Sequence, residues 1–79
     1  MVTVEQSRIS IDPRVCHGKP VISGTRVLVA NILGALASGQ SKQSILQDYP
    51  AIKEPDIDAS LDFATQMTRF ELFSRGIEV

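Results

Sequence analysis

Apolar and polar residues alternate in two short stretches near the start of the chain. Ile9-Ser10-Ile11 follows a polar segment, and Val21-Ile22 lies between turn signals at residues 18–20 and at Ser23-Gly24. Such runs predict β-strands, and Asp12-Pro13 predicts a turn after the first of them. The two runs can pair as a small hairpin, but two strands alone are not stable in water. We therefore expect this arm to pack against helices.

The period of the apolar positions changes to that of a helix at Val29. Apolar side chains recur from there at i, i+3, i+4, i+7 and i+8, which predicts a helix over residues 29–38. Gly39 fits the left-handed position just past the end of such a helix. Ser41 can cap the next helix, because its hydroxyl can accept a backbone N–H two or three residues further on.

A second helix is predicted over residues 42–49. Ile45, Leu46 and Tyr49 give it an apolar edge. It ends at Tyr49, because Pro50 disfavours a helical backbone in the residue before it.

A third helix is predicted over residues 55–70. Pro55 fits the first positions of a helix, and the acidic residues that crowd the first turn interact favourably with the helix macrodipole. Gly76 can end this helix or an extension of it. The apolar side chains form two neighbouring stripes, which consist of Ile57, Leu61, Ala64 and Thr68, and of Ala59, Phe63, Met67 and Phe70.

Together these elements predict a mainly α protein with one domain over residues 1–79. It consists of a β arm and loop (residues 1–28), a three-helix bundle (residues 29–73) and a tail (residues 74–79). Two helices joined by a short turn, with a third packed across them, form the helix-turn-helix arrangement. Three short amphipathic helices are equally a common way to build a small core, so the pattern alone does not separate the two.

Composition narrows the class of protein. The chain has 79 residues, 43% of them hydrophobic, which excludes a disordered chain. One cysteine cannot form an internal disulfide, and no apolar run approaches the roughly 20 residues of a membrane helix. The start lacks the pattern of a signal peptide. We therefore expect a cytoplasmic protein that acts without a membrane.

Charge is distributed unevenly along the chain although the net charge is only −1. Residues 1–42 hold five basic and two acidic residues, a net +3, whereas residues 43–79 hold three basic and seven acidic residues, a net −4. This asymmetry hints at two surfaces with different partners, although chance in a short chain explains it equally well.

Arg14, Lys19 and Arg26 are the candidate DNA-binding residues, because phosphate contacts need Lys or Arg. The acidic start of the third helix would repel DNA, so the basic first half must supply such contacts. For Arg26 the alternative is an ion pair with Asp12 or with a carboxylate of the third helix, which would lock the arm in place.

Cys16-His17 is the only sequence feature that suggests catalysis or metal binding. A structural zinc site needs four ligands, and a catalytic pair needs a third orienting group; the chain has one Cys and one His. We therefore interpret Cys16 as a small buried residue and His17 as a loop residue. No enzyme activity, cofactor or metal is expected.

The C-terminal segment holds more apolar residues than a small core can use. Residues that cannot be buried internally mark an interface, which predicts a homodimer or a bound partner. The alternative is that the segment closes the core of its own domain. The candidate partner-binding residues are Phe70, Leu72, Phe73, Ile77 and Val79.

A set of short sequence motifs follows in order along the chain, each present once. The motifs are Ile11-Asp12-Pro13, Val15-Cys16-His17-Gly18-Lys19-Pro20-Val21-Ile22, Gly24-Thr25-Arg26-Val27, Gly39-Gln40-Ser41, Ile45-Leu46, Tyr49-Pro50, Asp56-Ile57 and Leu61. Together they resemble the signature of a bacterial family known as domain of unknown function 433, from about Ile9 to Ala64. Family members usually carry Ser or Thr before the third helix, where this chain has Lys53. We expect Pro55 and the acidic first turn to substitute for that cap.

The resemblance implies a fold similar to homeodomain-like helix-turn-helix proteins. Members of the family often look like antitoxins beside a PIN-like ribonuclease toxin. The implied function is therefore an antitoxin that neutralises such a toxin and binds its own promoter DNA as a dimer. The alternative is a small helical protein-interaction module without DNA binding. Neither function involves a small-molecule substrate.

Overall fold

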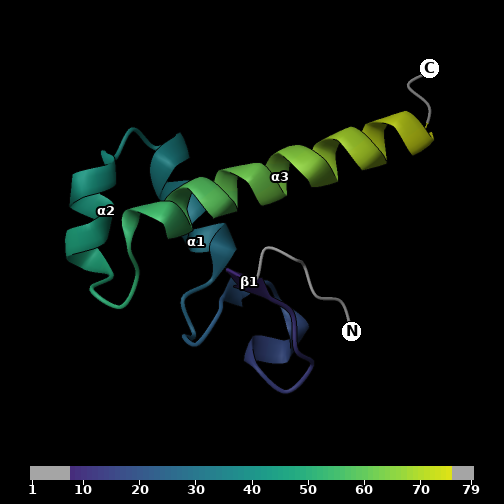
Figure 1. Ribbon diagram of the computed structural model, residues 1–79. Coiled ribbons are helices and arrows are strands. Elements are labelled where there is room, and N and C mark those ends of the chain that lie inside the picture. Colours follow the sequence, from purple (N-terminus) through teal and green to yellow (C-terminus); the bar gives the residue numbers. More distant parts are fainter. Residues whose placement is uncertain (1–7, 76–79) are drawn as a thin grey trace.

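A computed structural model describes the backbone of residues 8–75 and the side chains of residues 8–69. It confirms a mainly helical fold with a short β arm on the N-terminal side and three helices (Figure 1). Both predicted strands and all three predicted helices are present, and the third helix runs five residues beyond its predicted end. The elements are β1 (Ile9–Ser10), the 3-10 turn η1 (Cys16–Gly18), β2 (Val21–Ile22), α1 (Val29–Ala37), α2 (Lys42–Asp48) and α3 (Glu54–Arg75).

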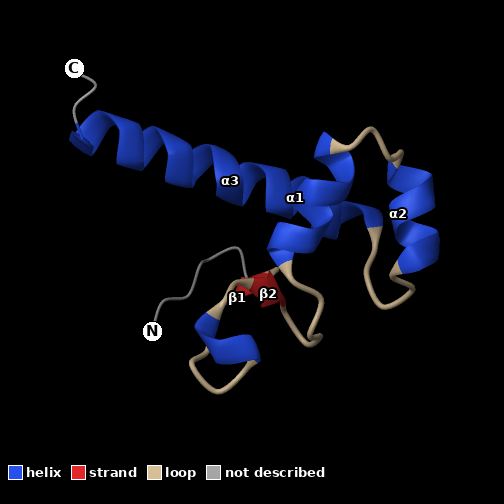
Figure 2. Cartoon of the chain, turned by 180° about the vertical axis from the view of Figure 1, so that it is seen from behind, coloured by secondary structure: helices blue, strands red, loops and turns tan. Residues whose placement is uncertain are grey.

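The two strands pair as the predicted antiparallel hairpin, with Ile9 opposite Ile22. On its other side β2 meets the chain that leads into α1, where the Ile22 N–H donates to the Val27 carbonyl at 3.0 Å. The arm therefore lies at the start of α1, as Figure 2 shows, and it also contacts α3. This is the support that a two-stranded ribbon needs, since alone it is not stable.

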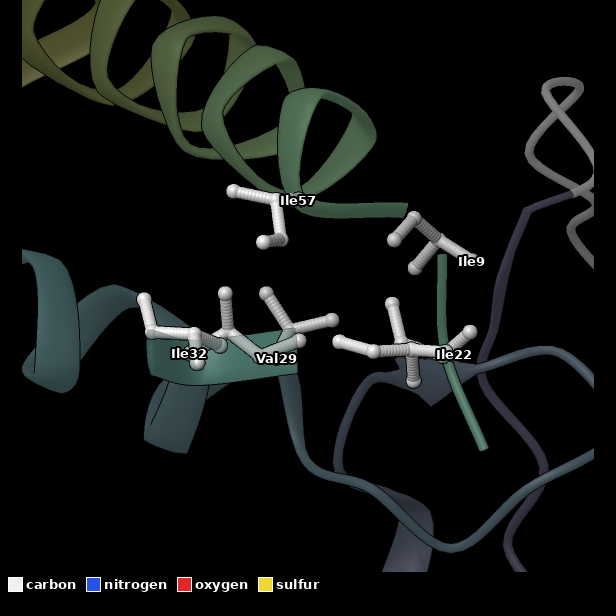
Figure 3. Packing of buried hydrophobic residues seen from close by; sticks show 7 residues of the cluster. Ile9, Ile22, Val29, Ile32 and Ile57 are labelled. Carbon is white, nitrogen blue, oxygen red and sulfur yellow. The ribbon is translucent and has the colours of Figure 1, made fainter. Parts of the chain in front are cut away.

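Isoleucine and valine side chains from every strand and helix form one core cluster (Figure 3). Each large side chain that is removed from water contributes roughly 1.5–3 kcal/mol. The buried members of the cluster are Ile9, Ile22, Val29, Ile32, Ile45, Ile52 and Ile57. The cluster draws on β1, β2, α1, α2, the connection before α3 and the first turn of α3, so these elements form one unit.

The helix ends agree with the signals in the sequence. The Ser44 N–H donates to the Ser41 hydroxyl at 3.1 Å, so Ser41 caps α2 as predicted. Gly39 follows α1 with a φ of +96°, the left-handed conformation that favours glycine. At the start of α3, the Lys53 N–H donates to the Asp56 carboxylate at 2.8 Å. This is the bond that an acid of the first turn makes in a capping box, while the Asp56 N–H, which a Ser or Thr at position 53 would accept, donates to the Lys53 carbonyl at 2.8 Å.

The two apolar stripes predicted on the third helix are only partly buried. Ile57 is fully buried and Phe63 half-buried, but Leu61 and Met67 are 41% and 46% exposed. The sequence pattern did not single out Ser60, which is fully buried and donates its hydroxyl to the Asp56 carbonyl at 2.9 Å. The stripes therefore extend beyond the part of α3 that the bundle covers.

Candidate functional site

The C-terminal part of α3 projects from the bundle. Every described buried residue of this helix lies in its first two turns, and Ser60 is the last of them. The 15 residues from Leu61 to Arg75 continue the helix for about 22 Å, past α1 and α2 in both views (Figures 1 and 2). The exposed Leu61 and Met67 lie on this projection. The projection of α3, residues 61–75, is the first candidate surface.

The first turn of α3 is fixed to the β arm by one carboxylate. Arg8 Nη1 donates to Asp56 Oδ1 at 2.9 Å, and the Asp56 side chain is only 9% exposed. The other carboxylate oxygen accepts the Lys53 N–H. Asp56 lies in the first turn as the macrodipole prediction requires, but it is not part of a solvated face with the other acids of this helix start, because it is buried and paired with Arg8.

Arg14, a candidate DNA contact, is bound to a neighbouring acid. Its guanidinium donates through Nε and Nη2 to the two carboxylate oxygens of Asp12, at 3.1 and 3.2 Å. The hydrogen bonds from Arg14 lower the pKa of Asp12, and those to Asp12 raise the pKa of Arg14. The positive charge of Arg14 is therefore neutralised locally. Asp12, which we considered as a partner of Arg26, is bound to Arg14 instead.

Lys42 is also held by acids. Its Nζ lies 2.8 Å from Asp58 Oδ1 and 3.7 Å from Glu54 Oε2, so it joins the start of α2 to the first turns of α3. The hydrogen bond to Asp58 is the main cause that raises the pKa of Lys42. Of the five basic residues in the first half of the chain, within the described side chains only Lys19 and Arg26 carry no ion pair.

Arg26 lies beside the η1 loop at a small hollow, the second candidate surface. The hollow has a volume of about 280 Å³ and is lined by Ser10, Val15, Val21, Gly24, Thr25 and Arg26. The structure thus brings Arg26 next to the loop that carries Arg14. Lys19 is exposed and does not line the hollow. The sequence indicated Arg26 but not the hollow, because Ser10 and Val15 meet Arg26 only once the chain is folded.

Cys16 and His17 adopt a backbone that is unusual for their residue type. Their φ values are +50° and +60°, in the left-handed region, where residues with a Cβ are strained. Cys16 is half-buried rather than buried, and His17 is exposed as expected of a loop residue. Within the residues that the structure describes, no group of three or more Cys, His, Asp or Glu residues could hold a metal ion.

The predicted partner-binding residues cannot be placed at the level of side chains. Phe70, Leu72 and Phe73 belong to the backbone of α3, but their side chains lie outside the described part of the chain, and Ile77 and Val79 lie outside the described residues altogether. Their role stays a prediction. In the described part of the chain, no helix is both long and apolar enough to cross a membrane.

Comparison with known proteins agrees with the resemblance in the sequence. The model of the family described as "Protein of unknown function (DUF433)" matches residues 9–64. A stretch of 43 residues is 40% identical to "Putative antitoxin VapB45" of Mycobacterium tuberculosis (strain ATCC 25618 / H37Rv) and covers 54% of this chain. The same stretch spans only 18% of that relative.

A solved structure shares the fold. The crystal structure of a DUF433 member protein from Anabaena variabilis matches with a TM-score of 0.72 and 30% sequence identity. The match covers 77% of this chain and 60% of that one. Because the family model spans most of the chain, the protein belongs to the DUF433 family.

Proposed function

We propose that this DUF433 protein is a non-catalytic, cytoplasmic antitoxin that binds and silences a PIN-like ribonuclease toxin through the projection of α3 and the residues after it. The observation that carries the proposal is the projection itself. The likeness to a protein named as an antitoxin supports the same role, although the aligned stretch is a small part of that relative.

A helical segment with few tertiary contacts gains little stability from its own hydrogen bonds. Isolated helices shorter than about 12–15 residues are marginal in water, and most helical stability comes from packing an amphipathic face. The projection also carries Thr65 and Thr68, whose hydroxyls bond to the carbonyls four residues earlier, which slightly destabilises a helix. Within the projection, Phe63 still packs against the core cluster, and a partner that packs along the exposed side of residues 61–75 supplies contacts that the bundle does not.

The chemistry of this segment fits a protein interface. Leu61 and Met67 are exposed, and the predicted anchors Phe70, Leu72, Phe73, Ile77 and Val79 follow them in the sequence. Burial of each large apolar side chain is worth roughly 1.5–3 kcal/mol. Charged residues stand between them: Arg69, Glu71, Arg75 and Glu78. Apolar and aromatic anchors within a polar rim are the usual energetic centre of an interface.

DNA binding by a homodimer is the other role that the resemblance implies, and the charges of the structure do not favour it. The order α2, connection and α3 resembles a helix-turn-helix pair, but ion pairs neutralise Arg8, Arg14 and Lys42. Lys19 and Arg26 remain as the contacts for phosphate in this half of the chain. Two unpaired basic residues offer few contacts for DNA. This favours the alternative, in which the chain binds proteins and no DNA.

Co-expression with a PIN-like ribonuclease encoded next to this chain tests the proposed function. We expect the chain to restore growth and to co-purify with the ribonuclease. Met67→Asp places a charge on the exposed projection and should weaken the complex about tenfold. Gln47→Asp adds the same charge at an exposed position of α2 and is the matched control. Equal neutralisation by both variants, or no complex with the parent chain, would exclude this role of the projection.

A further inference from the structure

The hollow beside Arg26 is formed by segments that hydrogen bonds hold in place. The Thr25 hydroxyl donates to the Ile22 carbonyl at 2.8 Å and accepts the Val27 N–H at 2.9 Å, which closes a tight turn around Arg26. On the other side, Cys16 Sγ lies 3.9 Å from the Arg26 carbonyl. The backbone that presents Arg26 is therefore fixed before any ligand arrives.

The strained η1 turn directly follows Val15, a residue that lines the hollow. The left-handed conformations of Cys16 and His17 each cost about 1 kcal/mol or more. The turn is closed by the Gly18 N–H, which donates to the Val15 carbonyl at 3.0 Å. This bond holds the backbone of Val15 in the turn, and Val15 lines the open hollow together with Thr25 and Arg26.

Two polar groups at this hollow have no partner in the described part of the chain. The Arg26 guanidinium and the Ser10 hydroxyl form neither a hydrogen bond nor an ion pair there. Val15 and Val21 supply apolar walls between them. A guanidinium and a hydroxyl donate hydrogen bonds to a carboxylate, and guanidinium matches that group in shape as well as in charge.

We propose that this hollow receives one acidic side chain of a protein partner, with Arg26 and Ser10 as the groups that bind its carboxylate. The site lies on the β arm and not on the projection of α3, so it is a second contact surface. That the partner is a protein rests on the function proposed above.

Size and charge favour a protein carboxylate over other anions. About 280 Å³ is at the lower limit of pockets that enclose a small molecule, but it has room for one side chain. Duplex DNA needs several phosphate contacts for useful affinity, and most cations nearby are already paired. Apolar walls match the methylene groups of an acidic side chain, which a phosphate lacks.

Titration of the isolated chain tests the site. The probes are N-acetyl-Val-Glu-Val-amide, the matched peptide with Gln in place of Glu, and inorganic phosphate, followed by NMR shifts of residues that line the hollow. We expect saturable shifts with the Glu peptide and a dissociation constant on the order of 1–10 mM. The Gln peptide should bind about fivefold more weakly, as expected for one exposed ion pair.

Variants of the chain localise the effect. Arg26→Gln should lose about fivefold in affinity for the Glu peptide, and Arg26→Lys should retain part of it. Lys19→Gln removes an equal charge outside the hollow and should change affinity less than twofold. Thermal unfolding of the Arg26 variants checks that the fold is intact, which the exposure of Arg26 favours.

The remaining outcomes overturn the proposal. They are equal binding of the two peptides, an equal loss with Lys19→Gln, tighter binding of phosphate than of the Glu peptide, and no saturable shift up to about 20 mM peptide. Because the titration needs no toxin, its failure leaves the antitoxin role standing. Failure of toxin neutralisation likewise leaves a positive titration standing.

Discussion

Arg8 Nη1 lies 2.9 Å from Asp56 Oδ1, and this ion pair joins two residues that are 48 positions apart in the chain. The same carboxylate accepts the Lys53 N–H and so caps α3. One buried acid therefore bonds both the backbone just before α3 and the arginine that precedes β1, and so attaches the helix to the β arm.

Removal of this carboxylate should destabilise the fold. Loss of a cap costs about 0.5–2 kcal/mol, and loss of a half-exposed ion pair adds at most about 1 kcal/mol. We expect Asp56→Ala to lower the free energy of unfolding by about 1–3 kcal/mol, and Arg8→Ala to lower it by less. Urea denaturation measures both values. Asp62→Ala, an exposed position of the same helix, should change it by no more than about 0.5 kcal/mol.

Arg8→Ala and Asp56→Ala together separate the two roles of the carboxylate. If Arg8→Ala costs as much as Asp56→Ala, the hydrogen bond to the Lys53 N–H contributes nothing to stability. If neither variant differs from Asp62→Ala, the ion pair and the cap are both without effect, which would contradict the account of how α3 is attached.

Two glycines that are close in sequence should respond in opposite directions to replacement by alanine. Gly34 lies within α1 with open space around its missing Cβ, so Gly34→Ala should stabilise the protein by about 0.5–1 kcal/mol. Gly39 has a φ of +96°, so Gly39→Ala should destabilise it by about 1 kcal/mol or more. Thermal or urea unfolding measures the difference. The same sign for both changes would refute the backbone conformation at Gly39.

The salt dependence of DNA binding should be shallow if the chain binds DNA at all. With Lys19 and Arg26 as the free cations of the basic half, log K should fall with log salt concentration at a slope of about −2 per chain. Lys19→Ala and Arg26→Ala should each remove about one unit. The double variant Asp12→Asn/Arg14→Gln removes both charges of an existing ion pair and should leave the slope unchanged.

Fluorescence anisotropy with upstream DNA at several salt concentrations measures these slopes. Asp58→Ala should bind equally or more tightly, because it removes an acid and releases Lys42 from its shorter ion pair. A slope much steeper than −2 per chain, or a large loss with the double variant, would show that the DNA surface lies elsewhere.

Local signals in the sequence were sufficient for most of the secondary structure. The period of the apolar residues from Val29 and the Ser41 cap can both be recognised from nearby residues in the sequence alone. The structure confirms both. The end of the third helix was not predictable from local signals. Its residues continue a helical pattern beyond the bundle, and nothing in the sequence shows where tertiary contacts cease.

The candidate sites were harder to predict because they depend on contacts between distant residues. Arg8 carried no signal that it would pair with Asp56, and Ser60 gave no sign of its burial. In the sequence, the positive charge of Arg14 looked available for a phosphate contact, whereas in the structure it is paired with Asp12. A count of charged residues therefore overestimates the basic surface, because it does not record which charges are paired.

Truncation after Thr68 tests the central claim most directly, since every described buried residue of the core lies before that point. The truncated chain, co-expressed with the PIN-like ribonuclease, should keep its helical circular dichroism and cooperative unfolding yet lose toxin neutralisation. Two results would contradict the account. A chain that unfolds would assign the C-terminal residues to the core of the domain, and a folded chain that protects cells fully would show that the projection of α3 beyond Thr68 does not bind the toxin.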